Sequence, residues 1–324
     1  MESIFAEIPK SILSEIEKNN SIVIISHKAP DGDALSSSLA LGLIARKLGK
    51  EAIILNSGPF QRKELAFLIN DILPCAPREF IAKKPLVAIV DCSTIDRLGD
   101  AYIGLEDLPT IVIDHHSSGK LFIPEEMSYI VSESPSTTLL IEELRCALGI
   151  DLDKELATYL YIGLATDTGF FHFLSDKTGP YAFQKASLFS QYGVNPYEIY
   201  DTLNDGKSLD ELKTASSLIE NSRLFYDGQL AIIYQGKESP YARLSDTIYQ
   251  QMLTVDGIKA VVFIKTKQEK FELGFRAKRN SGIDVGQIAA SIGGGGHRLA
   301  SGATISNQNG NIISYCVNLF SKIL

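Results

Sequence analysis

The chain has 324 residues, of which 45% are hydrophobic and 22% are charged, and its formal net charge is -8 at pH 7. This composition is that of a folded globular protein, and the length favours two domains over one. The acidic balance argues against a protein that coats long nucleic acid through a broad basic face. It does not exclude a small anionic substrate, because bound metal ions can reverse the local field.

The cysteines and the hydropathy pattern bear on location. Cys75, Cys92, Cys146 and Cys316 have neither disulfide nor zinc spacing, which suits a reducing cytosol. No stretch is long and apolar enough to span a membrane. The first segment, MESIFAEIPKSILSEIEKNN, lacks the basic start and apolar middle of a signal peptide. We therefore expect a cytoplasmic protein with no membrane partner.

Strands and helices are expected to alternate in the first part of the chain. Short β-branched or apolar runs predict buried strands, and longer runs with helical periodicity predict helices. The expected strands cover residues 21–26, 51–55, 86–90 and 110–113; the expected helical segments cover 3–18, 34–48, 61–70, 136–148, 154–166 and 177–192. This alternation predicts an α/β domain with a mainly parallel sheet and helices on both faces.

The pattern changes near residue 195. Pro196, Gly206 and several polar residues predict a linker over 195–210, between a domain at 1–194 and a domain at 211–324. A helix at about 209–223 is expected to open the second domain. Strands at 229–234, 260–265, 271–276 and 303–305, a helix at 285–292 and a terminal helix follow. They predict a smaller α+β domain with a mixed sheet.

The most informative motif is Ile113-Asp114-His115-His116, within the string IDHHSSG. It places an acid and two histidines at the carboxyl end of a predicted parallel strand, where open α/β sheets bind their ligands. A single histidine there would more often be structural. Two histidines directly after an acid favour a functional site.

Three further segments bring similar side chains to predicted strand or helix ends. The segment SHKAPDGDALSSS at 26–38 contains His27, Asp31 and Asp33; Asp91 ends the strand 86–90; and Asp167 precedes a glycine turn. Each aspartate also has a simpler interpretation. Asp33 could cap a helix, and Asp91 and Asp167 could cap turns.

Considered together, these residues favour a metal site. Five acids at one rim would repel one another unless cations neutralise them. Imidazole and carboxylate ligands without a thiolate suit manganese or another octahedral metal. The number of ligands is sufficient for two ions, which together could activate water and clamp a phosphoryl group.

A glycine run in the second part of the chain predicts an anion site. The segment GGGGHRLASGA at 293–303 contains Gly294, Gly295 and Gly296, directly followed by His297 and Arg298. Glycines let backbone amides approach an anion, and arginine pairs with phosphate, so phosphate binding is favoured over a flexible turn.

More positive charge follows a predicted strand in the same part of the chain. Arg276, Lys278 and Arg279 lie there, although Lys278 and Arg279 could equally belong to a solvated surface run.

These motifs, in this order, resemble the DHH phosphoesterase superfamily, and GFRAKRN and GGGGHRLASG resemble its associated C-terminal domain. The two-domain layout is most similar to the nano-RNase/pAp-phosphatase branch, which degrades very short RNA and removes the 3′-phosphate from adenosine 3′,5′-bisphosphate (pAp). The resemblance implies a manganese enzyme with two ions, with Mg²⁺ or Co²⁺ as substitutes. Its partners would be short single-stranded RNA or small nucleotides rather than long nucleic acid, and a homodimer is compatible with it.

The resemblance also implies individual roles. One manganese would be held by His27, Asp31 and Asp91, and the other by Asp33, Asp91, His115 and Asp167. His116 would contact the scissile phosphate or protonate the leaving group, and Asp114 would orient a histidine. Arg276 and the loop 294–297 would hold the substrate. The chain departs from the family pattern at Ser36, Gly119 and His172.

Alternative functions stay open at this point. The nearest is a phosphodiesterase that acts on cyclic dinucleotides or on their linear products, such as pApA. A catalytically silent nucleotide sensor is a different class, but a sensor would have no need of a complete ligand set. A pyrophosphatase would need more cationic side chains near the glycine run, and the short acidic chain disfavours a processive exonuclease.

Overall fold

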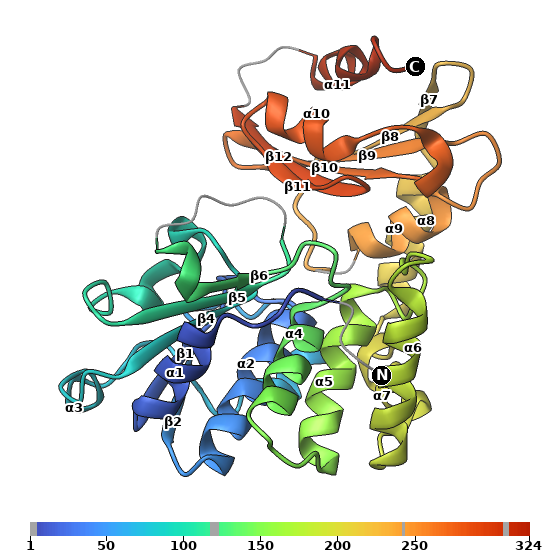
Figure 1. Ribbon diagram of the computed structural model, residues 1–324. Helices are drawn as coiled ribbons and strands as arrows, with labels where there is room; N and C mark the ends of the chain where they lie inside the picture. The colour runs from blue at the N-terminus through green and yellow to red at the C-terminus, as the bar shows by residue number, and fades with distance from the viewer. Residues whose placement is uncertain (1–4, 117–122, 242–243, 307–310) are drawn as a thin grey trace. The chain divides into compact units, whose positions relative to one another are not determined.

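The computed structural model describes residues 5–116, 123–241, 244–306 and 311–324. The chain divides into two compact units, Met1–Asp205 and Gly206–Leu324. Each unit contains one six-stranded sheet with helices packed against it (Figure 1). The expected α/β fold, with a parallel sheet followed by a mixed one, is confirmed.

The sheet of the first unit is parallel throughout, in the order β3-β2-β1-β4-β5-β6. Its central strands are short runs of β-branched and other apolar residues that are buried on both faces, as parallel sheets require. The strands are β1 (Ser21–Ile25), β2 (Glu51–Leu55), β3 (Ile72–Leu73), β4 (Leu86–Val90), β5 (Thr110–Asp114) and β6 (Ser128–Ile130).

The strand order reverses between β1 and β4. The chain passes from β1 through a helix to β2 on one side, and it later returns to form β4 on the other side of β1. Such a reversal leaves a crevice at the carboxyl ends of the two strands. His27 follows β1 and Asp91 follows β4, so both residues lie at this reversal.

Different helices cover the two faces of this sheet. On one face, α2 (Gly32–Lys47), α4 (Thr137–Ala147) and α5 (Lys154–Asp167) pack against Ile22, Ile24 and their neighbours (Figure 1). The other face presents Val23, Ile25 and residues in register with them to shorter helical segments. These segments are α3 (Arg78–Ile81) and the 3-10 helix η3 (Gly99–Tyr102); the 3-10 helix η2 (Ile95–Arg97), which precedes η3, buries none of its residues.

Two glycines let α2 and α5 approach closely. A Cβ added at Gly32 would overlap the side chain of Thr166, and a Cβ added at Gly163 would overlap Thr138 and the carboxylate of Asp33. Because Asp33 lies in the first turn of α2, this packing also places its carboxylate against α4 and α5.

Two expectations for the first unit are wrong in detail. The first helix does not extend over 3–18: α1 covers Lys10–Lys18 and starts directly after Pro9, which serves as its N-cap. The segment 61–70 forms a 3-10 helix, η1 (Lys63–Leu68), rather than an α-helix. The segment 195–210, where we place the linker, contains α7 (Pro196–Asn204), and the two units divide within it, after Asp205. The first unit also contains α6 (Gly179–Gln191) and η4 (Glu125–Met127).

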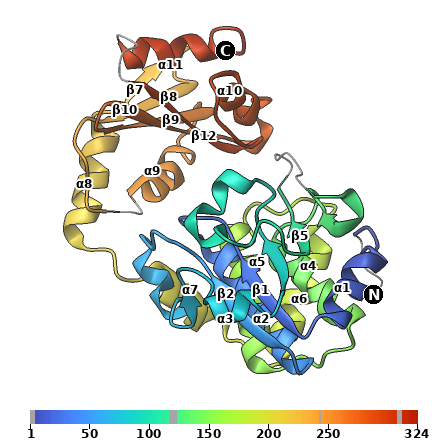
Figure 2. The same cartoon turned by 90° about the vertical axis from the view of Figure 1, so that its left-hand side faces the viewer.

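The second unit contains a mixed sheet in the order β11-β12-β10-β9-β8-β7, in which only β8 and β9 are paired in parallel. Helices α10 and α11 pack on one face, and α8 and α9 contribute to the apolar cluster on the other (Figure 2). The strands are β7 (Arg223–Phe225), β8 (Leu230–Gln235), β9 (Ala260–Lys267), β10 (Lys270–Ala277), β11 (Gly295–His297) and β12 (Ala300–Ser306). The helices are α8 (Leu209–Glu220), α9 (Leu244–Met252), η5 (Arg279–Ser281), α10 (Val285–Ser291) and α11 (Ile312–Phe320).

Among the described residues, no helix combines the length and the apolar character needed to cross a membrane.

We expect Gly163→Ala to lower the free energy of unfolding by about 1–3 kcal/mol, because the added methyl group has no space between α5, Thr138 and Asp33. Gly179→Ala is the matched control: Gly179 also lies in a helix, and its added Cβ would make only an ordinary contact with Leu174. Urea denaturation of both variants measures the difference. Equal stability of the two variants would contradict the tight packing at Gly163.

Candidate metal and phosphate site

Two histidines at the carboxyl edge of the sheet have the same orientation. Nδ1 of His27 lies 2.9 Å from the carbonyl oxygen of Lys28, and Nδ1 of His115 lies 3.0 Å from that of Ser134. A carbonyl can only accept, so each Nδ1 must carry the hydrogen. In the neutral rings Nε2 then carries the lone pair, which is the form in which histidine binds metals.

Asp91 lies among three histidines. Its carboxylate oxygens are 3.6 Å from Nε2 of His27, 3.7 Å from Nε2 of His115 and 3.6 Å from Nδ1 of His116. The hydroxyl of Thr137 donates a hydrogen bond of 2.8 Å to the same carboxylate. The backbone of Asp91 is left-handed, with φ +56°, and such strained residues concentrate at functional sites.

Asp31 and Asp33 both serve as helix caps, although not in the way the sequence indicated. Asp31 is the N-cap of α2 and accepts from the Ala34 amide. Asp33 lies inside α2 and instead accepts from the backbone amides of Thr137 and Thr138 at the start of α4, at 2.6 and 3.1 Å. The predicted capping function of Asp33 is thus present, but on a different helix. These contacts do not exclude a metal, since a carboxylate oxygen has more than one lone pair.

His116 is held differently from His115. Its Nδ1 lies 2.8 Å from Oδ1 of Asp114, and its backbone amide donates to the same oxygen at 3.1 Å. Asp114 is fully buried at the end of β5. The carboxylate therefore fixes the ring of His116 and occupies the nitrogen nearest Asp91.

The donor atoms form groups that fit divalent ions. The ligand atoms of His27, Asp31 and Asp91 lie within 4.8 Å of one another, and so do those of Asp33, His115 and Asp167. Asp167 ends α5, with a carboxylate oxygen 3.2 Å from Nε2 of His115. Asp91, Asp114 and His116 form a third group, but there the Asp114–His116 hydrogen bond already accounts for the short distance. Nitrogen and oxygen donors without a thiolate suit a hard or borderline divalent cation.

The pKa values of the acids in this cluster reflect their crowding. Burial, then the charge of Asp91, raise the pKa of Asp33 to about 7. Burial and the charges of Asp33 and Asp31 raise the pKa of Asp167 well above its usual value. The pKa of Asp31 is lowered to about 2, because His27 and the Ala34 amide outweigh the opposing effect of burial.

The histidines respond to the same acids. Burial alone would lower the pKa values of His27 and His115, but nearby carboxylates, Asp91 above all, raise both. Burial would likewise lower the pKa of His116, and the hydrogen bond to Asp114 and the charge of Asp91 raise it.

The predicted phosphate residues lie in the second unit. Arg276 lies on β10, and His297 and Arg298 are exposed at the hairpin between β11 and β12. Gly295 and Gly296 belong to β11 and pair with Gly302 and Ser301.

The amide of Gly294 is not open to an anion as expected, because it donates to the carbonyl oxygen of Ala289 at the end of α10. A Cβ at Gly294 would also overlap Gly302 and Ala303, so this glycine is required for backbone packing.

Sequence reasoning missed the residues that orient the others. Thr137 bonds both Asp33 and Asp91, and the carbonyl of Ser134 fixes His115. The run Ser134-Pro-Ser-Thr-Thr has the composition of a helix N-terminus, which is the one signal that could have drawn attention to it. Of the three departures from the family pattern, Ser36 is buried in α2, His172 is exposed, and Gly119 lies outside the described residues.

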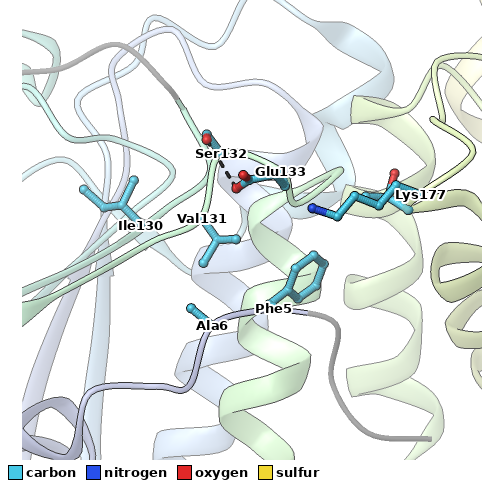
Figure 3. A pocket seen from close by; sticks show the side chains of 8 residues that line it. Phe5, Ala6, Ile130, Val131, Ser132, Glu133 and Lys177 are labelled. Carbon is cyan, nitrogen blue, oxygen red and sulfur yellow. Dashed lines mark hydrogen bonds between the residues drawn. The ribbon is translucent and has the colours of Figure 1, made fainter.

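A cavity of about 280 Å³ lies elsewhere in the first unit, at the end of β6 (Figure 3). Its lining comes from three separate stretches of chain and contains one carboxylate and one ammonium group, but no histidine. The lining residues are Phe5, Ala6, Ile130, Val131, Ser132, Glu133, Lys177 and Thr178. None of the predicted site residues lines it, so it is not the site described above.

Family comparisons match both units. Residues 21–164 match the DHH family N-terminal domain, and residues 231–316 match the DHHA1 domain. The bifunctional oligoribonuclease and PAP phosphatase NrnA of Thermus thermophilus is 27% identical over 88% of this chain and 84% of its own length.

Two further relatives differ in how much of their length is matched. The cyclic-di-AMP phosphodiesterase PdeA of Listeria monocytogenes is 26% identical over 92% of this chain, which spans only 46% of that protein. A crystal structure of an exopolyphosphatase-related protein from Bacteroides fragilis superposes with a TM-score of 0.81 at 22% identity, covering 99% of this chain and 97% of the other. That superposition supports the fold.

We expect the affinity of the purified protein for Mn²⁺ to rise between about pH 6 and pH 8, with release of protons on binding. Asp33, Asp167 and the histidines all have raised pKa values, so at the lower pH the metal-free protein in solution holds protons that a cation must displace. Calorimetry in buffers of different ionisation enthalpy counts these protons. His172→Ala, which removes an exposed histidine outside the cluster, is the control and should leave the count unchanged. Binding that is independent of pH would contradict this view of the site.

Proposed function

Because the chain belongs to the DHH family, we propose that it is a metal-dependent phosphoesterase that hydrolyses short oligoribonucleotides to mononucleotides and removes the 3′-phosphate from pAp. The observation that carries the proposal is the convergence of two Nε2-exposing histidines and four aspartates at the carboxyl edge of the parallel sheet. The similarity to the Thermus oligoribonuclease and PAP phosphatase over most of both chains supports this choice of substrates.

The proposed site holds two divalent ions, with manganese as the first candidate and Mg²⁺ or Co²⁺ as substitutes. His27, Asp31 and Asp91 would hold one ion, and Asp33, His115 and Asp167, together with Asp91, would hold the other. When bound, such ions lower the pKa of water and neutralise charge on phosphoryl oxygens. Asp91 is the candidate bridge, because its carboxylate lies within 3.7 Å of both metal-type histidines.

The protein's own groups would do the remaining work. The carbonyls of Lys28 and Ser134 keep Nε2 of His27 and His115 directed at the carboxylates, and Thr137 holds Asp91 in place. The hydrogen bond to Asp114 raises the pKa of His116, which favours the protonated ring, and this ring could donate a proton from Nε2 to the leaving oxygen. Asp114 fixes the ring and stabilises its charged form, as carboxylates do beside catalytic histidines.

The second unit would supply the contacts to the substrate's phosphates. Arg276, His297 and Arg298 offer positive charge, and Gly295 and Gly296 form a bare stretch of backbone. We assign catalysis to the first unit and substrate binding to the second. The formal net charge of -8 disfavours binding of long nucleic acid and agrees with a short substrate.

A second candidate is hydrolysis of cyclic dinucleotides or of linear products such as pApA. The similarity to the Listeria cyclic-di-AMP phosphodiesterase favours it, but this chain spans less than half of that protein. A silent nucleotide sensor is disfavoured, because all six metal-type ligands are present and grouped.

One assay separates these functions. Purified protein with Mn²⁺ is given pAp, pApA, cyclic di-AMP and 5′-labelled RNA of graded length. Turnover of pAp and of the shortest RNA, declining with length, supports the proposal; turnover confined to cyclic di-AMP or pApA supports the second candidate. Asp91→Asn is the inactive control, since asparagine tolerates the left-handed backbone while losing the charge. Activity that persists in this variant would argue against the proposed bridge.

We expect His116→Ala to bind metal normally and to lose about 10²–10⁴-fold in kcat, because it removes a proton donor without removing a proposed ligand. His115→Ala is the matched comparison and should lose metal as well as rate. Metal content by elemental analysis and kcat on pAp are measured on both variants. Equal metal loss in the two variants would show that the roles of the neighbouring histidines are assigned incorrectly.

A further inference from the structure

We propose that Tyr249 is a positioning residue for Arg276, holding its guanidinium ready for a substrate phosphate. The inference rests on the proposed function, in which Arg276 contacts phosphate. Cζ of Arg276 lies over the ring of Tyr249, 4.6 Å from its centroid. Nη1 of Arg276 also donates to the carbonyl oxygen of Phe275 at 2.9 Å. The guanidinium is therefore held on one face by a ring and at one corner by a carbonyl.

Tyr249 is a rigid support. It lies on α9 with 6% of its surface exposed, in the apolar cluster that also contains Ile248, Met252 and Phe263. Its ring meets the ring of Phe263 edge to face, with 6.2 Å between centroids. A side chain packed in this way cannot change its rotamer without opening the cluster, so its ring fixes where Arg276 can lie.

Gly274 provides the space that this arrangement needs. It precedes Arg276 by two residues on β10, so both residues belong to the same face of the sheet. A Cβ at Gly274 would collide with the hydroxyl oxygen of Tyr249, whereas the ring carbon Cζ would stay 3.4 Å away. The pattern Gly-Phe-Arg thus combines a position without a side chain, a core residue and the stacked arginine.

The stack affects binding rather than chemistry. A free arginine samples many rotamers and must give them up when it pairs with a phosphate. Stacking on an aromatic ring leaves the edge of the planar guanidinium available for two parallel hydrogen bonds to an anion. Tyr249 would therefore lower KM for substrates with a phosphate at this position and leave the metal-dependent step unchanged.

The test compares Tyr249→Phe, Tyr249→Leu, Gly274→Ala and the double variant Gly274→Ala/Tyr249→Phe, with Tyr234→Leu as control. Tyr234 lies in the same unit, half-exposed, and its hydroxyl contacts Thr266 rather than arginine. KM and kcat are measured on pAp and on a short RNA, and also on bis-p-nitrophenyl phosphate, a small ester without a second phosphate.

We expect Tyr249→Leu to raise KM for pAp and RNA roughly 5- to 30-fold, with kcat and hydrolysis of the small ester unchanged. Tyr249→Phe keeps the ring and should match the unmodified protein, as should Tyr234→Leu. Gly274→Ala should raise KM like Tyr249→Leu. The double variant should return to the level of Tyr249→Phe, because removing the hydroxyl removes the atom with which the methyl group collides.

Several results would overturn the inference. The first is an unchanged KM for pAp in Tyr249→Leu although Arg276→Ala raises it. The second is a loss of activity in Tyr249→Leu that is equally large on pAp and on bis-p-nitrophenyl phosphate, which would indicate a purely structural role for Tyr249. A double variant as impaired as Gly274→Ala would show that the hydroxyl collision is not the cause. If Arg276→Ala itself leaves KM unchanged, the phosphate role of Arg276 in the proposed function fails and this inference fails with it. The Nε resonance of Arg276 gives a readout besides activity: its ring-current shift should persist in Tyr249→Phe and disappear in Tyr249→Leu.

Discussion

Three aspartates, Asp33, Asp91 and Asp114, are almost completely buried at one edge of the parallel sheet, and the site depends on how their charges are compensated. Burying a carboxylate is costly unless hydrogen bonds or opposite charges surround it. Each of the three has its own compensation: two backbone amides of α4 for Asp33, the Thr137 hydroxyl for Asp91, and the ring and amide of His116 for Asp114. Burial and the charge of Asp91 nevertheless raise the pKa of Asp33, so the hydrogen bonds offset only part of the cost of burying its charge.

The architecture of the first unit follows from bringing these groups together. Parallel strands end at one edge, so the residues after β1, β4 and β5 meet there even though the sequence separates them widely. Helices α2 and α5 add Asp31, Asp33 and Asp167, and their close approach at Gly32 and Gly163 sets the distance between these acids. The two glycines, which have no side chain, thus determine the spacing of the aspartates on these helices.

Local structure could be predicted from the sequence, whereas contacts between residues that are distant in the chain could not. Buried strands and most helices could be predicted from their periodicity, and the site residues could be placed at strand ends because topology fixes where parallel strands end. The contact of Asp33 with the amides of Thr137 and Thr138 joins residues more than a hundred positions apart, and no local sequence pattern predicts it. No local pattern predicts the stacking of Arg276 on the ring of Tyr249 either. The helix at 196–204 was missed because Pro196 indicates a loop as readily as the first turn of a helix.

His115 and His116 show how neighbouring residues of one type acquire different chemistry. Both follow β5 and both are close to Asp91, so neither sequence nor proximity separates them. The difference is the atom that engages Nδ1. For His115 it is a neutral carbonyl, which sets the tautomer and leaves Nε2 as a lone pair facing carboxylates. For His116 it is the buried carboxylate of Asp114, whose hydrogen bond raises the pKa of the ring and favours its charged form. In the proposed function, a metal ligand and an acid are therefore adjacent in the chain, and the group bonded to Nδ1 of each ring would set its role.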